Sequence, residues 1–163
     1  MIRPDRLTIK AAEALQEAGK LARTRGNPVL NDAHLLRTLL DQDESIVTPL
    51  LQKLGVNVAR LREAADREIG RFPRQSGTTG EPTMARELTQ ALDVADREAE
   101  ALGDAYVSTE HLLLGLVEVK GTSARQLLAE SKIGKDQLVS AINAVRGSHR
   151  VTDQEPEQKY QAL

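Results

Sequence analysis

Two residues with the greatest capacity for chemistry stand side by side: Glu110 and His111, in the stretch YVSTEHLLLGL at positions 106–116. A carboxylate beside an imidazole could act as an acid–base pair or supply two ligands to a metal ion. Neighbouring residues of a helix point about 100° apart, however, so these side chains do not face each other. With Ser108 as N-cap, the pair is better interpreted as a helix start, where the positive end of the helix dipole favours Glu110.

The remaining residues do not complete a catalytic or metal site. The three histidines are His34, His111 and His149, and the chain has no cysteine. A zinc site needs three or four converging ligands, whereas His34 and His111 have no further ligand at helical spacing. The chain has neither a Walker A sequence nor a G-x-S-x-G motif, and GTTGEP at 77–82 follows no predicted strand. We therefore expect no catalytic residue, metal or cofactor in this chain.

The overall composition excludes further classes. A formal net charge of −2 without a clustered basic excess gives no footprint for nucleic acid, and the candidate recognition helix at 109–119 has no arginine. No apolar run approaches the roughly 20 residues of a membrane span, and the N-terminus has no apolar core of a signal peptide. We expect a cytoplasmic protein whose core consists of Leu, Ala, Val and Ile, because aromatic residues make up only 2% of the chain.

The chain contains two copies of one unit. When the sequence is shifted by 77 positions against itself, residues 8–70 lie over 85–147 without a gap, and 14 of the 63 pairs are identical. The identical pairs are mainly apolar residues and turn glycines, which indicates a shared packing plan. The histidine is kept, as His34 and His111, whereas the glutamate of the second copy stands opposite Ala33. A histidine present in both copies is expected to serve the shared fold.

Each copy is predicted to form four short helices, because apolar residues recur every three to four positions. In the first copy the expected helices are 8–25, 32–42, 46–54 and 58–70. In the second copy the first helix ends at Gly103 and the second runs over 109–119. The third contains Leu127 and Leu128, and the fourth ends at Gly147. No stretch shows sustained alternation with a period of two, so strands are not predicted.

These elements give an all-α fold of two pseudo-symmetric four-helix repeats packed as one domain. One unit with so few aromatic residues would bury little surface, which favours packing of the two copies together. The first repeat spans 1–70 and the second 84–147. Residues 71–83 read as an exposed inter-repeat linker, and 148–163 as the start of a flexible linker toward a further domain.

The second helices resemble a known family. STEHLLLGL at 108–116 fits the pattern [ST]-x-E-H-[IL]-L-x-[GA]-L, and NDAHLLRTL at 31–39 departs from it at Ala33. Two such units resemble the Clp N-terminal domain of AAA+ chaperones over residues 5–147. The opening DRLT, the linker RFPRQSG and the tail VTDQEPEQKYQAL are similar to the branch of ClpB-type disaggregases.

The resemblance implies a domain that binds unfolded or aggregated polypeptide in a shallow apolar groove and passes it to a hexameric ring. ATP and Mg²⁺ would belong to domains downstream, with a co-chaperone system of the Hsp70 type as partner and a role in the stress response. The isolated domain is expected to be a monomer. The family's binding positions carry over to Thr8, Asp104 and Glu110, with Leu92, Tyr106 and His111 as groove candidates.

Three alternatives stay open. The domain could dock adaptors of a ClpC- or ClpA-type protease ATPase, although that branch carries the glutamate in both repeats. It could regulate ring assembly as a structural element. An acid–base enzyme using Glu110 and His111 is disfavoured by the helix geometry given above.

Overall fold

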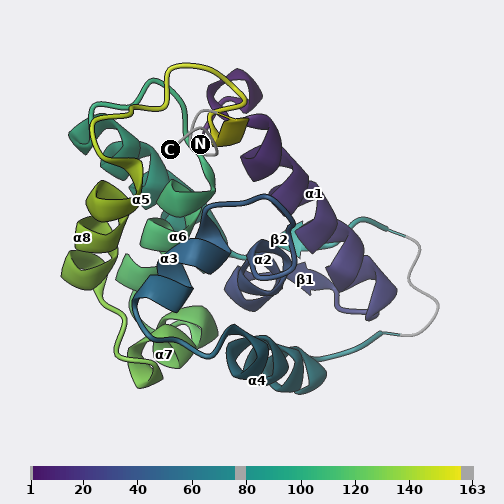
Figure 1. The fold of residues 1–163 in the computed structure, drawn as a ribbon. Coiled ribbons are helices and arrows are strands. Elements are labelled where there is room, and N and C mark those ends of the chain that lie inside the picture. The colour runs from purple at the N-terminus through teal and green to yellow at the C-terminus, as the bar shows by residue number, and fades with distance from the viewer. Residues whose placement is uncertain (1, 76–79, 159–163) are drawn as a thin grey trace.

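The computed structural model describes residues 2–75 and 80–158 (Figure 1). In this part of the chain the elements are η1 (Pro4–Arg6), α1 (Ile9–Thr24), β1 (Val29–Leu30), α2 (Asp32–Leu39), α3 (Val47–Lys53), α4 (Val58–Gly70), β2 (Thr83–Met84), α5 (Arg86–Ala101), α6 (Thr109–Glu118), α7 (Ser123–Glu130) and α8 (Lys135–Arg146). The predicted all-α fold of two four-helix repeats is confirmed. None of the described helices is both long enough and apolar enough to cross a membrane.

Short polar side chains define where the helices begin. The hydroxyl of Thr8 accepts a hydrogen bond of 3.2 Å from a first-turn amide of α1. Asn31 and Ser108 are the N-caps of α2 and α6, and each donates its backbone N–H to Nδ1 of the histidine three residues later, His34 or His111. The two histidines thus take the place that Glu or Gln holds in an ordinary capping box.

Short extended segments of the two repeats pair with each other, which the sequence did not predict. β1 pairs in parallel with β2, where Leu30 lies opposite Met84, and an isolated parallel bridge joins Leu7 to Val107. The offset of 77 converts one pair into the other, because Leu7 corresponds to Met84 and Leu30 to Val107. The segment before the first helix of each repeat therefore pairs with the segment before the second helix of the other.

One apolar cluster holds both repeats together. It contains buried side chains from all eight α-helices, and α2 and α6 lie at its centre. α6 is buried along nearly its whole length and packs closely on α5, where a Cβ on Gly115 would come 2.1 Å from the carbonyl oxygen of Ala91. The core extends across the repeat boundary, so the two repeats form one packed unit.

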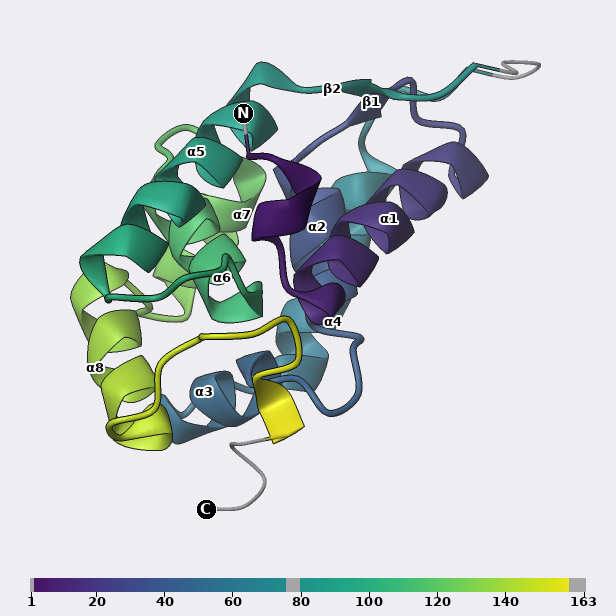
Figure 2. The same cartoon turned by 90° about the horizontal axis from the view of Figure 1, so that it is seen from above.

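The described parts of both predicted linkers lie against the domain. In the first, the Gln75 N–H donates to the carbonyl of Gly26 at 2.9 Å, and Thr83 belongs to β2. Residues 148–158, here called the strap, leave the end of α8 and cross to the start of α1 (Figure 2). The expectation of a free linker after Gly147 therefore differs from the structure over these residues. Residues 76–79 and 159–163 lie outside the described part of the chain.

Candidate binding site

Four of the six predicted binding residues gather at the start of α1 and α6, and they are buried. Thr8 caps α1, Asp104 lies in the loop after α5, and Glu110 and His111 stand in the first turn of α6. Their exposed fractions are between 0% and 5%. Tyr106, in the same loop, is half-buried.

Leu92 lies on α5, apart from these four residues, and belongs to the apolar core. Its side chain is buried as well. Of the three predicted groove residues only Tyr106 is therefore partly exposed, because Leu92 and His111 are buried.

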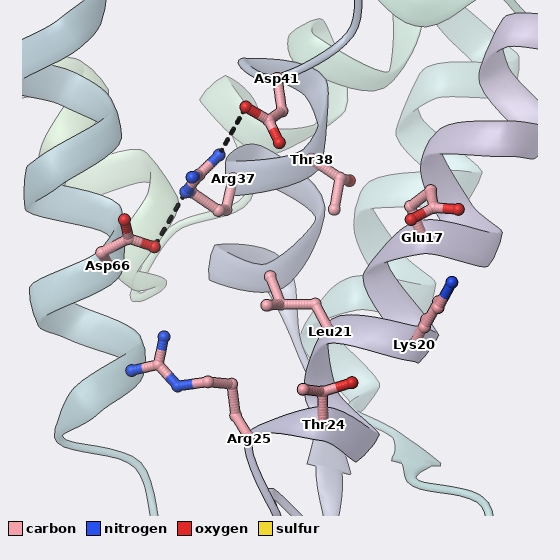
Figure 3. A pocket seen from close by; sticks show the side chains of 9 residues that line it. All are labelled: Glu17, Lys20, Leu21, Thr24, Arg25, Arg37, Thr38, Asp41 and Asp66. Carbon is pink, nitrogen blue, oxygen red and sulfur yellow. Dashed lines mark hydrogen bonds and ion pairs between the residues drawn. The ribbon is translucent and has the colours of Figure 1, made fainter.

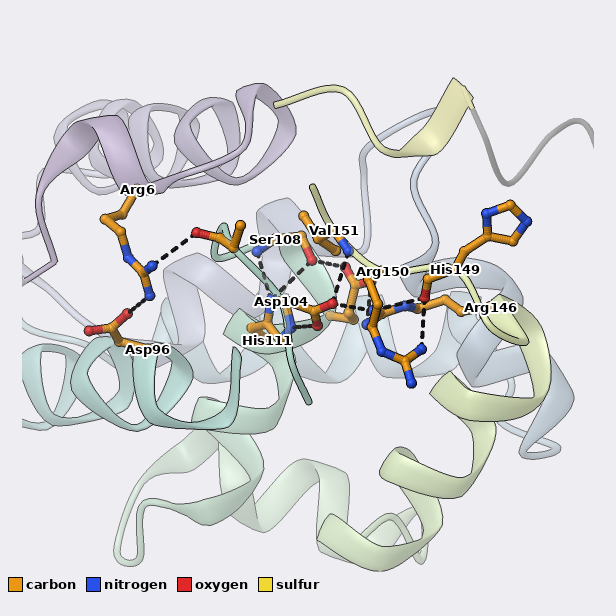
Figure 4. Close-up of polar contacts among 11 residues, drawn as sticks. Arg6, Asp96, Asp104, Ser108, His111, Arg146, His149, Arg150 and Val151 are labelled. Atoms are coloured by element: carbon orange, nitrogen blue, oxygen red, sulfur yellow. Dashed lines mark hydrogen bonds and ion pairs between the residues drawn. The ribbon is translucent and has the colours of Figure 1, made fainter. Parts of the chain in front are cut away.

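Asp104 is the centre of a buried polar network (Figure 4). One carboxylate oxygen lies 2.7 Å from Nε2 of His111, and the other accepts hydrogen bonds from the guanidinium of Arg146 and from the Val151 N–H. Burial by itself would raise the pKa of Asp104. The hydrogen bonds that its carboxylate accepts outweigh burial and lower the pKa to about 2.

His111 is fully engaged in this network. Its Nδ1 accepts the Ser108 N–H at 2.8 Å, so the ring proton is on Nε2, which donates to Asp104. The first repeat has the same arrangement with neutral groups, since Nε2 of His34 lies 3.0 Å from Oδ1 of Asn27. Burial, and secondarily Arg25, lowers the pKa of His34 to about 4. Both histidines hold the loop before the second helix against that helix.

Glu110 lies inside the protein rather than on an exposed rim. Its Oε1 accepts from the Ser108 hydroxyl, and its Oε2 is 3.5 Å from Nη1 of Arg146. The side chain is 1% exposed. Arg146 comes from α8 and supplies the counter-charge that allows two carboxylates to be buried here.

The charged network is specific to the second repeat. The positions of Asp104, Glu110 and Arg146 correspond at the offset of 77 to Asn27, Ala33 and Ile69. Three neutral residues of the first repeat thus correspond to three charged residues of the second. Arg146 was missing from the sequence-based prediction, and the one available signal was an arginine opposite an isoleucine on a predicted apolar helix face.

The strap completes the burial of this site. The Ala105 N–H donates to the Val151 carbonyl at 2.8 Å, and the Ile9 N–H donates to the Gln154 carbonyl at 3.0 Å. The Val151 side chain is fully buried. The strap is therefore held by backbone hydrogen bonds to the loop after α5 and to the first residue of α1.

Comparisons with known proteins identify the family. The model of the Clp repeat (R) N-terminal domain matches residues 6–147. The chain belongs to this family. The matched family is that of a repeat domain and not of a nucleotide-binding module.

Relatives and solved structures agree with this assignment. The chain is 38% identical to chaperone protein ClpB of Rhodopirellula baltica over 161 residues and 41% identical to ClpB of Mycobacterium tuberculosis over 156 residues, which is 99% and 96% of the chain. It spans about 18% of the length of these relatives. The Hsp104 N-terminal domain of Candida albicans superposes with a TM-score of 0.81 at 21% identity, covering 93% of this chain and 98% of that one.

A ClpV N-domain in complex with a VipB peptide has the same fold. Its TM-score is 0.67 at 21% identity, and 85% of each chain is covered.

The Clp repeat domain has a concave region away from the buried network. A groove of about 410 Å³ lies between α1, α2 and α4 (Figure 3). Across it Arg37 donates to Asp66 at 2.8 Å and pairs with Asp41 at 3.2 Å. Its lining is largely charged and includes none of the six predicted binding residues.

Proposed function

We propose that this Clp repeat domain recruits unfolded or aggregated polypeptide for an ATP-dependent disaggregase of the ClpB type and passes it to the hexameric ring of the parent protein. Its similarity to ClpB chaperones over almost the whole chain supports the choice of parent. ATP and Mg²⁺ would act in other domains of that parent. A co-chaperone of the Hsp70 type and a cytoplasmic location are part of the same proposal.

The observation that carries the proposal is a pair of backbone N–H groups, those of Ile9 and Ala105, that bind main-chain carbonyls; this pair is here called the edge. Both N–H groups bind carbonyls of the strap, that of Ile9 the carbonyl of Gln154 and that of Ala105 the carbonyl of Val151. Hydrogen bonds to main-chain atoms do not depend on the bound sequence. Such an edge suits a protein whose substrates share exposed backbone and apolar side chains but no common sequence.

The surroundings of this edge fit the same role. Ile9 is one of two large hydrophobic side chains that the described residues expose, at 44%. Tyr106 is half-buried in the loop beside Ala105, where an amphipathic ring makes a good contact residue. We propose that Ile9 and Tyr106 contact the polypeptide.

The buried residues would act beneath this surface. We propose that Thr8, Asp104, Glu110 and His111 fix the edge from below, while Leu92 supports it from the core. Each single contact is expected to be weak. A ring that carries several tethered domains gains from the high effective concentration of its copies.

A titration with a permanently unfolded polypeptide, such as a reduced and carboxymethylated protein, tests the proposal. Amide NMR signals of residues 7–9 and 104–107 should shift. Ile9→Ser should weaken binding roughly tenfold, because an aliphatic side chain contributes about 1.5 kcal/mol on burial. Val29→Ser is the matched control, since Val29 is 41% exposed but lies in β1, away from this edge. Absence of binding at every concentration, by this chain and also by a chain that ends at Gly147, would remove the recruiting role.

A second candidate is docking of a specific partner protein. The solved complex of a ClpV N-domain with a VipB peptide favours it, because there a domain of this fold binds a peptide. Capture of folded partners in preference to unfolded chains would support this candidate over recruitment.

A further inference from the structure

We infer that the strap, residues 148–158, is an internal competitor that occupies the polypeptide-binding edge and must detach before an extended substrate segment binds there. This inference rests on the proposed function and identifies how the same site is regulated.

The strap makes the contacts that an extended ligand would make. The Val151 carbonyl accepts from Ala105, the Val151 N–H donates to Asp104 at 2.9 Å, and the Gln154 carbonyl accepts from Ile9. The Gln154 side-chain amide adds a bond of 3.3 Å to the Leu7 carbonyl. The N–H groups of Ile9 and Ala105 are not available to another chain while these bonds persist.

Side chains of the strap fill the remaining space. Val151 is 0% exposed, Pro156 is buried, and Glu157 is 9% exposed. A β-branched residue and a proline match the apolar segments that unfolded proteins expose. The strap thus offers the edge backbone carbonyls and two apolar side chains, as an apolar substrate segment would.

The strap nevertheless binds in a way that permits release. Glu157 is buried close to a site that already holds the carboxylate of Glu110, and Asp153 adds a second negative charge on the strap itself. Lys10 of α1 is the positive group that faces it. A substrate segment with a neutral or basic residue at the place of Glu157 avoids this repulsion, so it can displace the strap.

The equivalent place in the first repeat supports this interpretation. There residues 73–75 of the inter-repeat segment lie along the loop after α1, with the Asn27 side-chain amide donating to the Pro73 carbonyl at 3.0 Å. That segment is covalently continuous with β2 and packs beside a neutral Asn. The strap instead donates a hydrogen bond to Asp104 and places Glu157 close to Glu110, whose carboxylate repels that of Glu157.

The test compares variants of the full chain by the Kd for a fluorescently labelled unfolded polypeptide and by amide exchange at Ile9 and Ala105. Val151→Ala loosens the strap and should lower the Kd up to tenfold, since about 1.5 kcal/mol of apolar burial is lost and the open fraction rises. Glu157→Gln should raise the Kd. Glu155→Gln, an equal change of charge at an exposed strap position, is the matched control and should leave the Kd unchanged.

The outcomes separate the two proposals. A lower Kd with faster Ile9 and Ala105 exchange in Val151→Ala supports the competitor. Equal or weaker binding by Val151→Ala, with binding by the unmodified chain intact, overturns the competitor and leaves recruitment standing. A chain that ends at Gly147 is the second variant. All three chains, namely the unmodified chain, Val151→Ala and the chain that ends at Gly147, could remain helical and yet fail to bind. That result would overturn the proposed recruitment of polypeptide and, with it, the competitor role of the strap.

Discussion

Replacing Arg146 by isoleucine, the residue at the equivalent position of the first repeat, tests the buried network most directly. The Arg146 side chain is 3% exposed. It pairs with the side chains of Asp104 and Glu110, which are 0% and 1% exposed. Its loss leaves two carboxylates without their counter-charge in the interior. Removing one partner of a buried ion pair costs about 3–5 kcal/mol, a large fraction of the roughly 5–15 kcal/mol by which a domain is stable.

The matched control copies the whole neutral arrangement of the first repeat. The triple variant Asp104→Asn, Glu110→Ala and Arg146→Ile reproduces the residues found there, namely Asn27, Ala33 and Ile69. Replacing a complete buried ionic group by neutral residues is often without cost. The triple variant should therefore recover most of the stability that the single variant loses.

Urea unfolding followed by far-ultraviolet circular dichroism measures both effects. We expect the single variant to lose about 3–5 kcal/mol and the triple variant to return to within about 1–2 kcal/mol of the unmodified chain. A single variant that loses less than about 1 kcal/mol would show that Arg146 does not neutralise the site. A triple variant as unstable as the single one would refute the correspondence between the repeats.

Three further predictions concern packing and pH. Gly115→Ala should cost about 1–3 kcal/mol in thermal unfolding, because the new Cβ would lie 2.1 Å from the Ala91 carbonyl oxygen and α5 would have to shift. The pKa of His34 falls to about 4 on folding, so its contribution is complete above pH 6.5 and is lost as pH falls toward 4; urea unfolding should show a loss of about 3 kcal/mol there that His34→Gln does not share. Burial raises the pKa of Glu157, so strap docking should tighten as pH falls from 7 toward that pKa; a higher protection factor of the Ile9 amide, taken relative to an unfolded peptide at the same pH, would report it, and Glu157→Gln should remove this pH dependence.

The sequence predicts the helices well because their signals are local and repeated. Apolar spacing, N-caps such as Ser108 and the offset of 77 are all visible in the residues themselves. β1 and β2 were missed because a strand of two residues is too short to show an alternating pattern.

The burial of Glu110 could not be predicted for a different reason. Its exposure depends on Arg146, which α8 brings from a distant part of the chain, and on the strap. The composition of the strap is polar, which favours a free linker, yet backbone hydrogen bonds and the buried side chains of Val151 and Pro156 hold it in place. Long-range pairing decides both features, and a local pattern carries no information about it.

The exchange of extended segments between the repeats has a consequence for how the chain is made. Leu7 finds its partner at Val107, so the first repeat stays incomplete until the second has left the ribosome as far as α6. Neither half can reach its final state by itself. Closing so long a loop slows folding more than it affects stability, and it ties the two halves into one cooperative transition. The two repeats therefore form one folding unit, joined by two equivalent strand pairings, rather than two independent modules.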